Sequence, residues 1–92
     1  MASKDFAGIV FRDAGTQAAF DRLVAAVVAA EQARVPLAQR HAVAERDLDA
    51  GRISEAQFRT LDDQYMAANN QIAAAKRAVD RFLTTHREYT SR

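Results

Sequence analysis

The sequence predicts an all-α chain, an antiparallel coiled-coil-like helical hairpin that dimerises into a four-helix bundle. Apolar residues recur at alternating steps of three and four from Phe58 to Tyr89, and a second run with the same spacing extends from Phe20 to Leu48. Such spacing lines one stripe of a helix, which packs against a partner helix along a continuous seam. Helix-ending and helix-starting residues separate the two runs around Gly51.

Composition and charge narrow the class of protein. The 92 residues, 49% of them hydrophobic and 27% charged, suffice for one small folded domain. A formal net charge of +1 gives no general attraction to nucleic acid or acidic membranes. The chain has no Cys, which excludes disulfides and thiolate metal sites. No signal peptide or membrane-spanning run is evident, so we expect a soluble cytoplasmic protein without a membrane partner.

Residues 1–14 form an extended arm, distinct from the hairpin of residues 15–92. The apolar run from Phe6 to Phe11 contains β-branched residues and is broken by Gly8, so it is not expected to be helical. We interpret it as an arm that folds back onto the hairpin or a neighbouring subunit. Alternatively, it is a docking peptide for another protein, which it would contact through Phe6, Ile9 and Phe11.

The first helix is predicted over residues 16–50, with Asp13 or Thr16 as its cap. Pro36 lies inside this segment, and an interior proline usually kinks a helix. The apolar spacing keeps its phase through Pro36, which favours a single helix kinked there. Two helices, with Pro36 at the start of the second, remain the alternative.

A tight turn is predicted over residues 50–54, followed by a second helix over 54–88. Gly51 is suited to the left-handed conformation that ends a helix. Ser54 and Gln57 fit the S-x-x-Q capping box of the next helix. The stretch from Glu45 to Leu61 is similar to the hairpin of the short-C-terminal-domain family, which has a Gly-x-Ile-Ser/Thr turn followed by an acidic residue and Phe. We take no function from this resemblance.

Folding the chain about Gly51 aligns the two apolar stripes in pairs of mostly large and small residues. The predicted layers are Ala44 with Phe58, His41 with Leu61, Leu37 with Tyr65, Arg34 with Ala68, Ala30 with Ile72, Val27 with Ala75, Leu23 with Val79, and Phe20 with Phe82. A register one heptad longer, with a looser turn, is also possible. Arg34 takes a central position of the seam, where a polar residue favours a role in fixing the register and oligomeric state.

The stretch from Leu23 to Ala30 is apolar around the whole helix, so faces other than the seam must also be covered. We expect a second copy of the chain to cover them. The predicted oligomer interface comprises Leu23, Val24, Val27, Val28, Ile72 and Ala73. The competing explanation is that the arm of the same chain covers Val24 and Val28 and leaves a monomer.

No residue pattern predicts catalysis, a cofactor or a metal site. His41 and Glu45 lie one helical turn apart, but zinc needs three or four ligands and nothing nearby in the sequence completes the set. The acidic pairs Asp62-Asp63 and Asp47/Asp49 are expected on solvated faces, without an apolar pocket that would raise a pKa. The chain is therefore not expected to be an enzyme.

The expected function is a non-enzymatic protein–protein interaction module: an adaptor, an assembly component, or a small phage or bacterial inhibitor of a host protein. Its expected partners are itself and another protein. The alternative is a nucleic-acid-associated protein whose basic end, formed by Lys76, Arg77, Arg81 and Arg87, contacts phosphates. The same cations also suit the dipole at the end of a helix. A secreted hairpin like the WXG100 family is disfavoured, because the turn at Gly51 lacks the Trp of that family's name.

Overall fold

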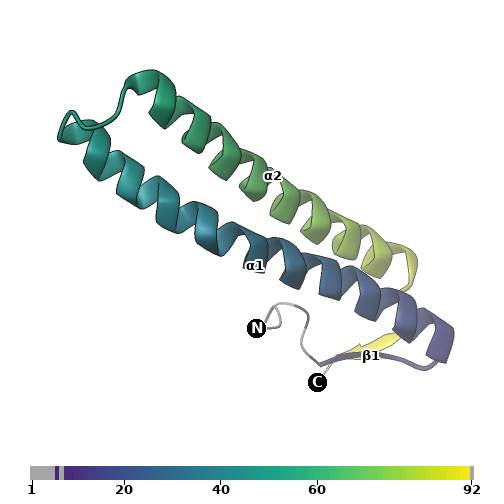
Figure 1. Ribbon diagram of the computed structural model, residues 1–92. Helices are drawn as coiled ribbons and strands as arrows, with labels where there is room; N and C mark the ends of the chain where they lie inside the picture. The colour runs from purple at the N-terminus through teal and green to yellow at the C-terminus, as the bar shows by residue number, and fades with distance from the viewer. Residues whose placement is uncertain (1–5, 7, 92) are drawn as a thin grey trace.

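Two long antiparallel helices make up most of the molecule. The computed structural model describes residue 6 and residues 8–91. Helix α1, Ala14–Asp49, has 36 residues and helix α2, Glu55–Thr85, has 31. The helices lie side by side with a short turn at one end (Figure 1), which confirms the predicted helical hairpin. The molecule is a rod that measures 57 × 20 × 16 Å.

The turn between the helices is built on Gly51, which has a φ of 73°. The N–H of Arg52 donates to the Asp47 carbonyl at 2.8 Å, and the N–H of Gly51 donates to the Leu48 carbonyl at 3.0 Å. These two bonds form a Schellman motif, which satisfies carbonyl groups at the end of a helix. The predicted stop signal at Gly51 is therefore confirmed.

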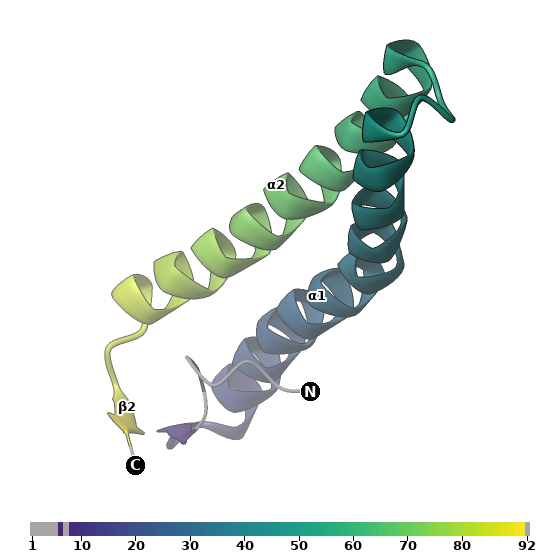
Figure 2. The ribbon, with the colours of Figure 1, turned by 90° about the vertical axis from the view of Figure 1, so that its left-hand side faces the viewer.

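Helix α2 begins at the predicted capping box. The Ser54 hydroxyl accepts from the Gln57 N–H at 3.1 Å, and the Gln57 side chain accepts from the Ser54 N–H at 2.8 Å. Helix α1 is capped by Asp13, whose carboxylate accepts from the Thr16 N–H at 2.8 Å. Of the two caps considered for α1, Asp13 is the one observed, and α1 continues through Pro36. Figure 2 shows that α1 bends along its length, as expected of a helix that contains proline.

The seam between the helices has the register centred on Gly51. The rings of Phe20 and Phe82, a predicted pair, lie with their centroids 6.0 Å apart. Farther along, Arg34 Nη1 donates to Asn69 Oδ1 at 2.9 Å, which ties the helices together at the polar position of the seam. Val27 and Val79 are completely buried and form the centre of the apolar core.

The end opposite the turn is closed by two short strands. Strand β1, Ile9–Phe11, pairs antiparallel with β2, Tyr89–Ser91, so that Val10 faces Thr90. The Phe11 N–H also donates to Gln17 Oε1 at 2.7 Å, which attaches β1 to α1. Figure 2 shows both strands beside the ends of the helices.

The seam is shorter than the apolar spacing predicted. Helix α2 ends at Thr85 instead of residue 88, and His86 is its C-cap. The prediction that the helical seam includes Tyr89 is wrong, since Tyr89 belongs to β2. The ring of Phe11 explains this departure, because it packs between both helices and β2: its centroid lies 5.3 Å from that of Phe20, 5.6 Å from that of Phe82 and 5.5 Å from that of Tyr89.

Candidate functional site

An open groove of about 580 Å³ runs along the hairpin near the turn and is the candidate functional site. We call it the tip groove. It is lined by Pro36, Gln39, Arg40, Val43, Ala44, Asp47, Ile53 and Leu61. Most of its lining is apolar, and it lies at the opposite end of the rod from the two strands.

Helix α1 supplies one wall of the tip groove through a stripe with steps of four, three and four. The stripe comprises Pro36, Arg40, Val43 and Asp47, and residues at this spacing share one helical face. Val43 is 46% exposed although it is apolar. Beside it, Ala44 is only 3% exposed, because it belongs to the seam with α2. The groove therefore combines a small buried residue with a large apolar side chain that water reaches.

Opposite charges stand at two points of the α1 wall. Arg40 is exposed, and no acidic side chain among the described residues lies within ion-pair distance of it. The Asp47 side chain is 29% exposed, and its Oδ1 lies 3.6 Å from Nη1 of Arg52. At 3.6 Å this contact is an ion pair without a hydrogen bond, so the Asp47 carboxylate keeps its capacity to accept from another donor.

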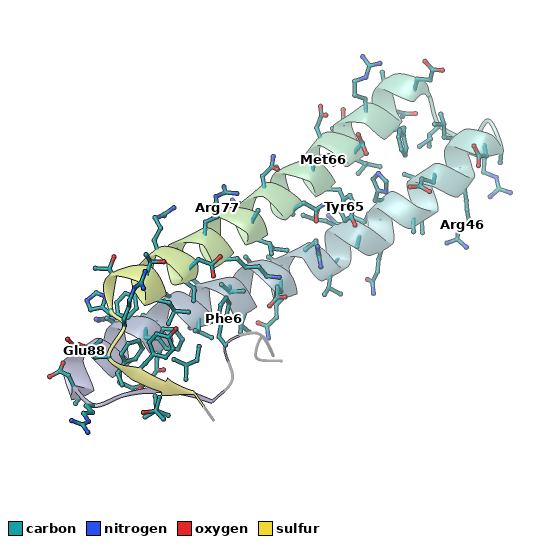
Figure 3. All side chains as sticks on the ribbon, turned by 180° about the vertical axis from the view of Figure 1, so that it is seen from behind. Phe6, Arg46, Tyr65, Met66, Arg77 and Glu88 are labelled. Carbon is teal, nitrogen blue, oxygen red and sulfur yellow. The ribbon has the colours of Figure 1, made fainter. Side chains whose placement is uncertain are left out.

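A polar cluster around His41 joins the helices close to the tip groove. His41 Nδ1 lies 3.1 Å from Glu45 Oε1 and His41 Nε2 lies 2.7 Å from Asp62 Oδ1. Its ring stacks on Tyr65 with centroids 4.7 Å apart and lies 5.3 Å from Phe58. Figure 3 shows Tyr65 between the two helices. His41 is thus a polar seam residue, as predicted, although the fold surrounds it with Phe58, Tyr65 and Asp62 rather than with Leu61 alone.

The His41 cluster is not arranged to hold a metal ion. Its two carboxylates approach opposite nitrogens of the ring, so the three side chains do not converge on one point. Within residues 6 and 8–91, no group of three or more His, Asp or Glu side chains has the geometry of a metal site. Each carboxylate instead contacts one ring nitrogen of His41, along α1 for Glu45 and across the helices for Asp62. These contacts satisfy polar groups at the seam, which is a structural role.

The residues considered for partner docking lie in the apolar core of this conformation. Phe6 and Phe11 are buried and pack with Phe20, Val27 and Val79, and Ile9 packs against the same cluster. Figure 3 shows Phe6 next to α1. Phe6, Ile9 and Phe11 of the arm therefore pack back onto the hairpin, in agreement with the first of the two interpretations, and residues 1–5 and 7 lie outside the described part of the chain. A partner reaching these side chains would have to displace them from the core.

Two of the six residues predicted for the oligomer interface are buried within one chain. Val27 and Ile72 are buried, and Leu23 and Val24 pack against the cluster that contains Phe6 and Phe11. Val24 thus packs on the cluster that includes the arm, as the competing explanation expected, whereas Val28 is not among the described residues of that packing. Val28 and Ala73 are half-buried, and the choice between a monomer and a dimer stays a prediction.

The four basic residues considered for phosphate contacts do not form one free surface. Arg77 and Arg81 are exposed on α2, where Asp80 lies next to Arg81 in the sequence. Arg87 Nε donates to the Thr84 carbonyl at 3.2 Å, and Lys76 is half-buried and has an interaction of its own. Arg87 thus satisfies a carbonyl at the end of α2, in agreement with the interpretation based on helix termini.

Sequence reasoning missed the tip groove and the strand β2. The groove arises where the turn residue Ile53 and the α2 residue Leu61 meet the α1 stripe, an arrangement that heptad spacing does not specify. For β2, the aromatic and β-branched pair Tyr89-Thr90 after His86 was the available signal.

The chain matches no protein-family model, no curated protein and no solved structure. In the part of the chain that the structure describes, neither helix contains a stretch apolar and long enough to cross a membrane.

Proposed function

We propose that the chain is a cytoplasmic, non-enzymatic protein–protein interaction module, an adaptor, assembly component or small inhibitor, and that it binds its partner through the tip groove. The single observation that carries this proposal is the groove itself, an open and mainly apolar surface on a rigid hairpin. Concave surfaces with a mainly apolar lining and a few polar groups are typical of binding sites.

The free energy for binding comes from covering apolar surface in the groove. Val43 is about half exposed, and burying such a side chain stabilises a complex by roughly 25 cal/mol per Å² of apolar area. The two helices hold the backbone of the groove walls in place, so little backbone ordering is needed when a partner docks. An amphipathic helix fits this surface, because a partner helix offers apolar residues at the same three- and four-residue steps as the α1 stripe.

The groove has the composition of a binding surface rather than of an active site. The described residues that line it include no Ser, Cys, Lys or His that would serve as a nucleophile or a proton carrier. Its two charged residues, Arg40 and Asp47, are well placed to orient a partner and to exclude partners of the wrong charge. Nucleic-acid binding is less favoured, since Asp80 interrupts the exposed arginines of α2.

Site-specific photo-crosslinking in the cells that make the protein tests this function. A photoreactive amino acid at Val43 should crosslink to a protein, because Val43 lies in the groove. The matched control places the same group at Ala25, an exposed residue of α1 outside the groove. Equal labelling of proteins from both positions, or no labelling from Val43, would contradict the proposal.

A further inference from the structure

We propose that the occupant of the tip groove is a second copy of this chain, docked antiparallel with α1 against α1 about a two-fold axis that passes between Val43 and Ala44. This inference rests on the proposed function, because it names the partner of the same groove. It follows from three features of the α1 wall: its apolar centre, its two flanking charges and the order of those charges.

The apolar centre of the wall is complementary to itself. Val43 is 46% exposed and Ala44 is 3% exposed. Ala44 is already covered by α2, so Val43 is the apolar side chain that this wall offers to a partner. An axis at this point brings Val43 next to Val43 of the partner subunit. The contact buries the exposed apolar surface of both side chains, which stabilises the dimer.

The flanking charges are complementary in the same alignment. Arg40 and Asp47 lie equally far in sequence from the axis, on opposite sides of it, and both belong to the exposed α1 stripe. The two-fold axis brings Arg40 opposite Asp47 of the partner subunit, and brings the partner subunit's Arg40 opposite Asp47. A symmetric interface uses each pairing twice, so one surface supplies two ion pairs. A parallel alignment would instead place like charges against each other, which disfavours it.

The few contacts that Arg40 and Asp47 make within the chain support a second copy as the occupant. Arg40 has no acidic neighbour within ion-pair distance among the described residues, and the Asp47 contact with Arg52 is 3.6 Å long. Arg40 can therefore form an ion pair across an interface, and Asp47 can form a closer pair there than the one it has with Arg52. On the face that the sequence predicted for dimerisation, Val27 and Ile72 are buried within the chain, whereas Val43 in the tip groove is 46% exposed.

A charge-exchange experiment tests this alignment by analytical ultracentrifugation. The wild-type chain should sediment as a dimer of 10.2 kDa subunits. Arg40→Asp and Asp47→Arg should each raise the dissociation constant at least tenfold, because each variant places like charges at both contacts. An equimolar mixture of the two variants should recover a dimer, since every cross-interface pair then joins an Asp to an Arg. The double variant should recover it for the same reason.

Matched controls separate this outcome from a general effect of charge or folding. Arg81→Asp makes the same change at an exposed site of α2 outside the groove and should leave the dissociation constant unchanged. Circular dichroism should show equal helicity in all variants, since the altered side chains lie at the surface. A monomeric wild type at millimolar concentration, or failure of the mixture to recover a dimer, would overturn the inference. A monomer that still crosslinks to a different protein through Val43 would overturn the self-docking but leave the proposed function intact.

Discussion

Gly51 is the residue on which the reversal of the chain depends most directly. Its φ of 73° lies in the left-handed region, which costs a residue with a side chain roughly 1–2 kcal/mol. A Cβ added at Gly51 would meet no atom within 4 Å, so the space around it is open. Any penalty for replacing Gly51 therefore comes from the backbone conformation alone.

Replacing Gly51 by Val should lower the free energy of unfolding by about 1–2 kcal/mol, because a β-branched residue resists the left-handed conformation. Gly51→Asn is the matched control and should cost less, since Asn adopts this conformation more readily. Urea unfolding followed by circular dichroism measures both values. Equal stability of the Val variant and the wild type would show that Gly51 does not hold this conformation in solution.

Asp13, the cap of α1, makes the stability of the fold depend on pH. The N–H of Thr16, followed by its hydroxyl, donates to the Asp13 carboxylate and holds the pKa of this residue below its ordinary value of 3.8. A carboxyl whose pKa is lower in the folded state than in the unfolded state stabilises the fold at higher pH. That stabilisation is lost as the pH falls through the folded-state value.

The stability difference between the wild type and Asp13→Ala should therefore be constant above about pH 5 and shrink as the pH falls below about 4. Asp13→Asn retains an acceptor for the Thr16 N–H without a charge. The stability difference between Asp13→Asn and Asp13→Ala should therefore not change with pH in this way. Thermal unfolding between pH 2 and pH 7 checks both. A wild-type advantage over Asp13→Ala that does not shrink between pH 5 and pH 2 would contradict the assignment of the cap.

His41 shows that heptad spacing predicts the position of a residue on the seam but not the contacts of its side chain. The spacing placed His41 on the seam, and the ring does lie between the helices. The spacing did not predict contact with Asp62 or stacking on Tyr65, because these depend on the direction of each side chain. The same holds for Arg34, whose predicted partner was Ala68 but whose guanidinium reaches Asn69.

At the scale of elements, local signals predicted the turn and the caps, whereas the strands depend on distant partners. The Schellman motif and the capping box each involve residues close in sequence, so their residue types are sufficient to identify them. Strand β2 pairs with β1 from the other end of the chain. Its first residue, Tyr89, continues the apolar spacing of α2, so periodicity alone assigned Tyr89 to the helical seam.

Substitutions of Phe11 test how strongly β1 contributes to the stability of the fold. It is 6% exposed and contacts rings from both helices and β2. Phe11→Ala should lower the free energy of unfolding by about 3–5 kcal/mol, the range for large buried aromatics. Phe11→Leu should cost less, because it retains most of the buried volume.

Val10→Ala is the control for Phe11, since Val10 lies in the same strand but is 40% exposed, and it should change stability by only about 0.5 kcal/mol. Chemical denaturation of the three variants and the wild type gives the values. If Phe11→Ala is no more harmful than Val10→Ala, the arm does not pack on the hairpin in solution.

At the scale of the whole molecule, the two ends of the rod differ in kind. Aromatic side chains from the helices and strands close one end, and the tip groove remains open near the other. The hairpin and its register were predictable because they follow from one-dimensional spacing. The groove was not, because it arises from three segments that meet only after folding, namely the α1 stripe, Ile53 and Leu61.

The central claim is that the tip groove is the surface through which the chain binds a second copy of itself. Backbone amide NMR spectra recorded from micromolar to millimolar concentration test it most directly, because they report association residue by residue. We predict concentration-dependent shifts confined to residues 36–53 and the neighbourhood of Leu61, with the amides of Phe11 and Phe20 unaffected. Shifts centred on residues 23–30 and 72–73, or spectra that do not change with concentration, would contradict the account.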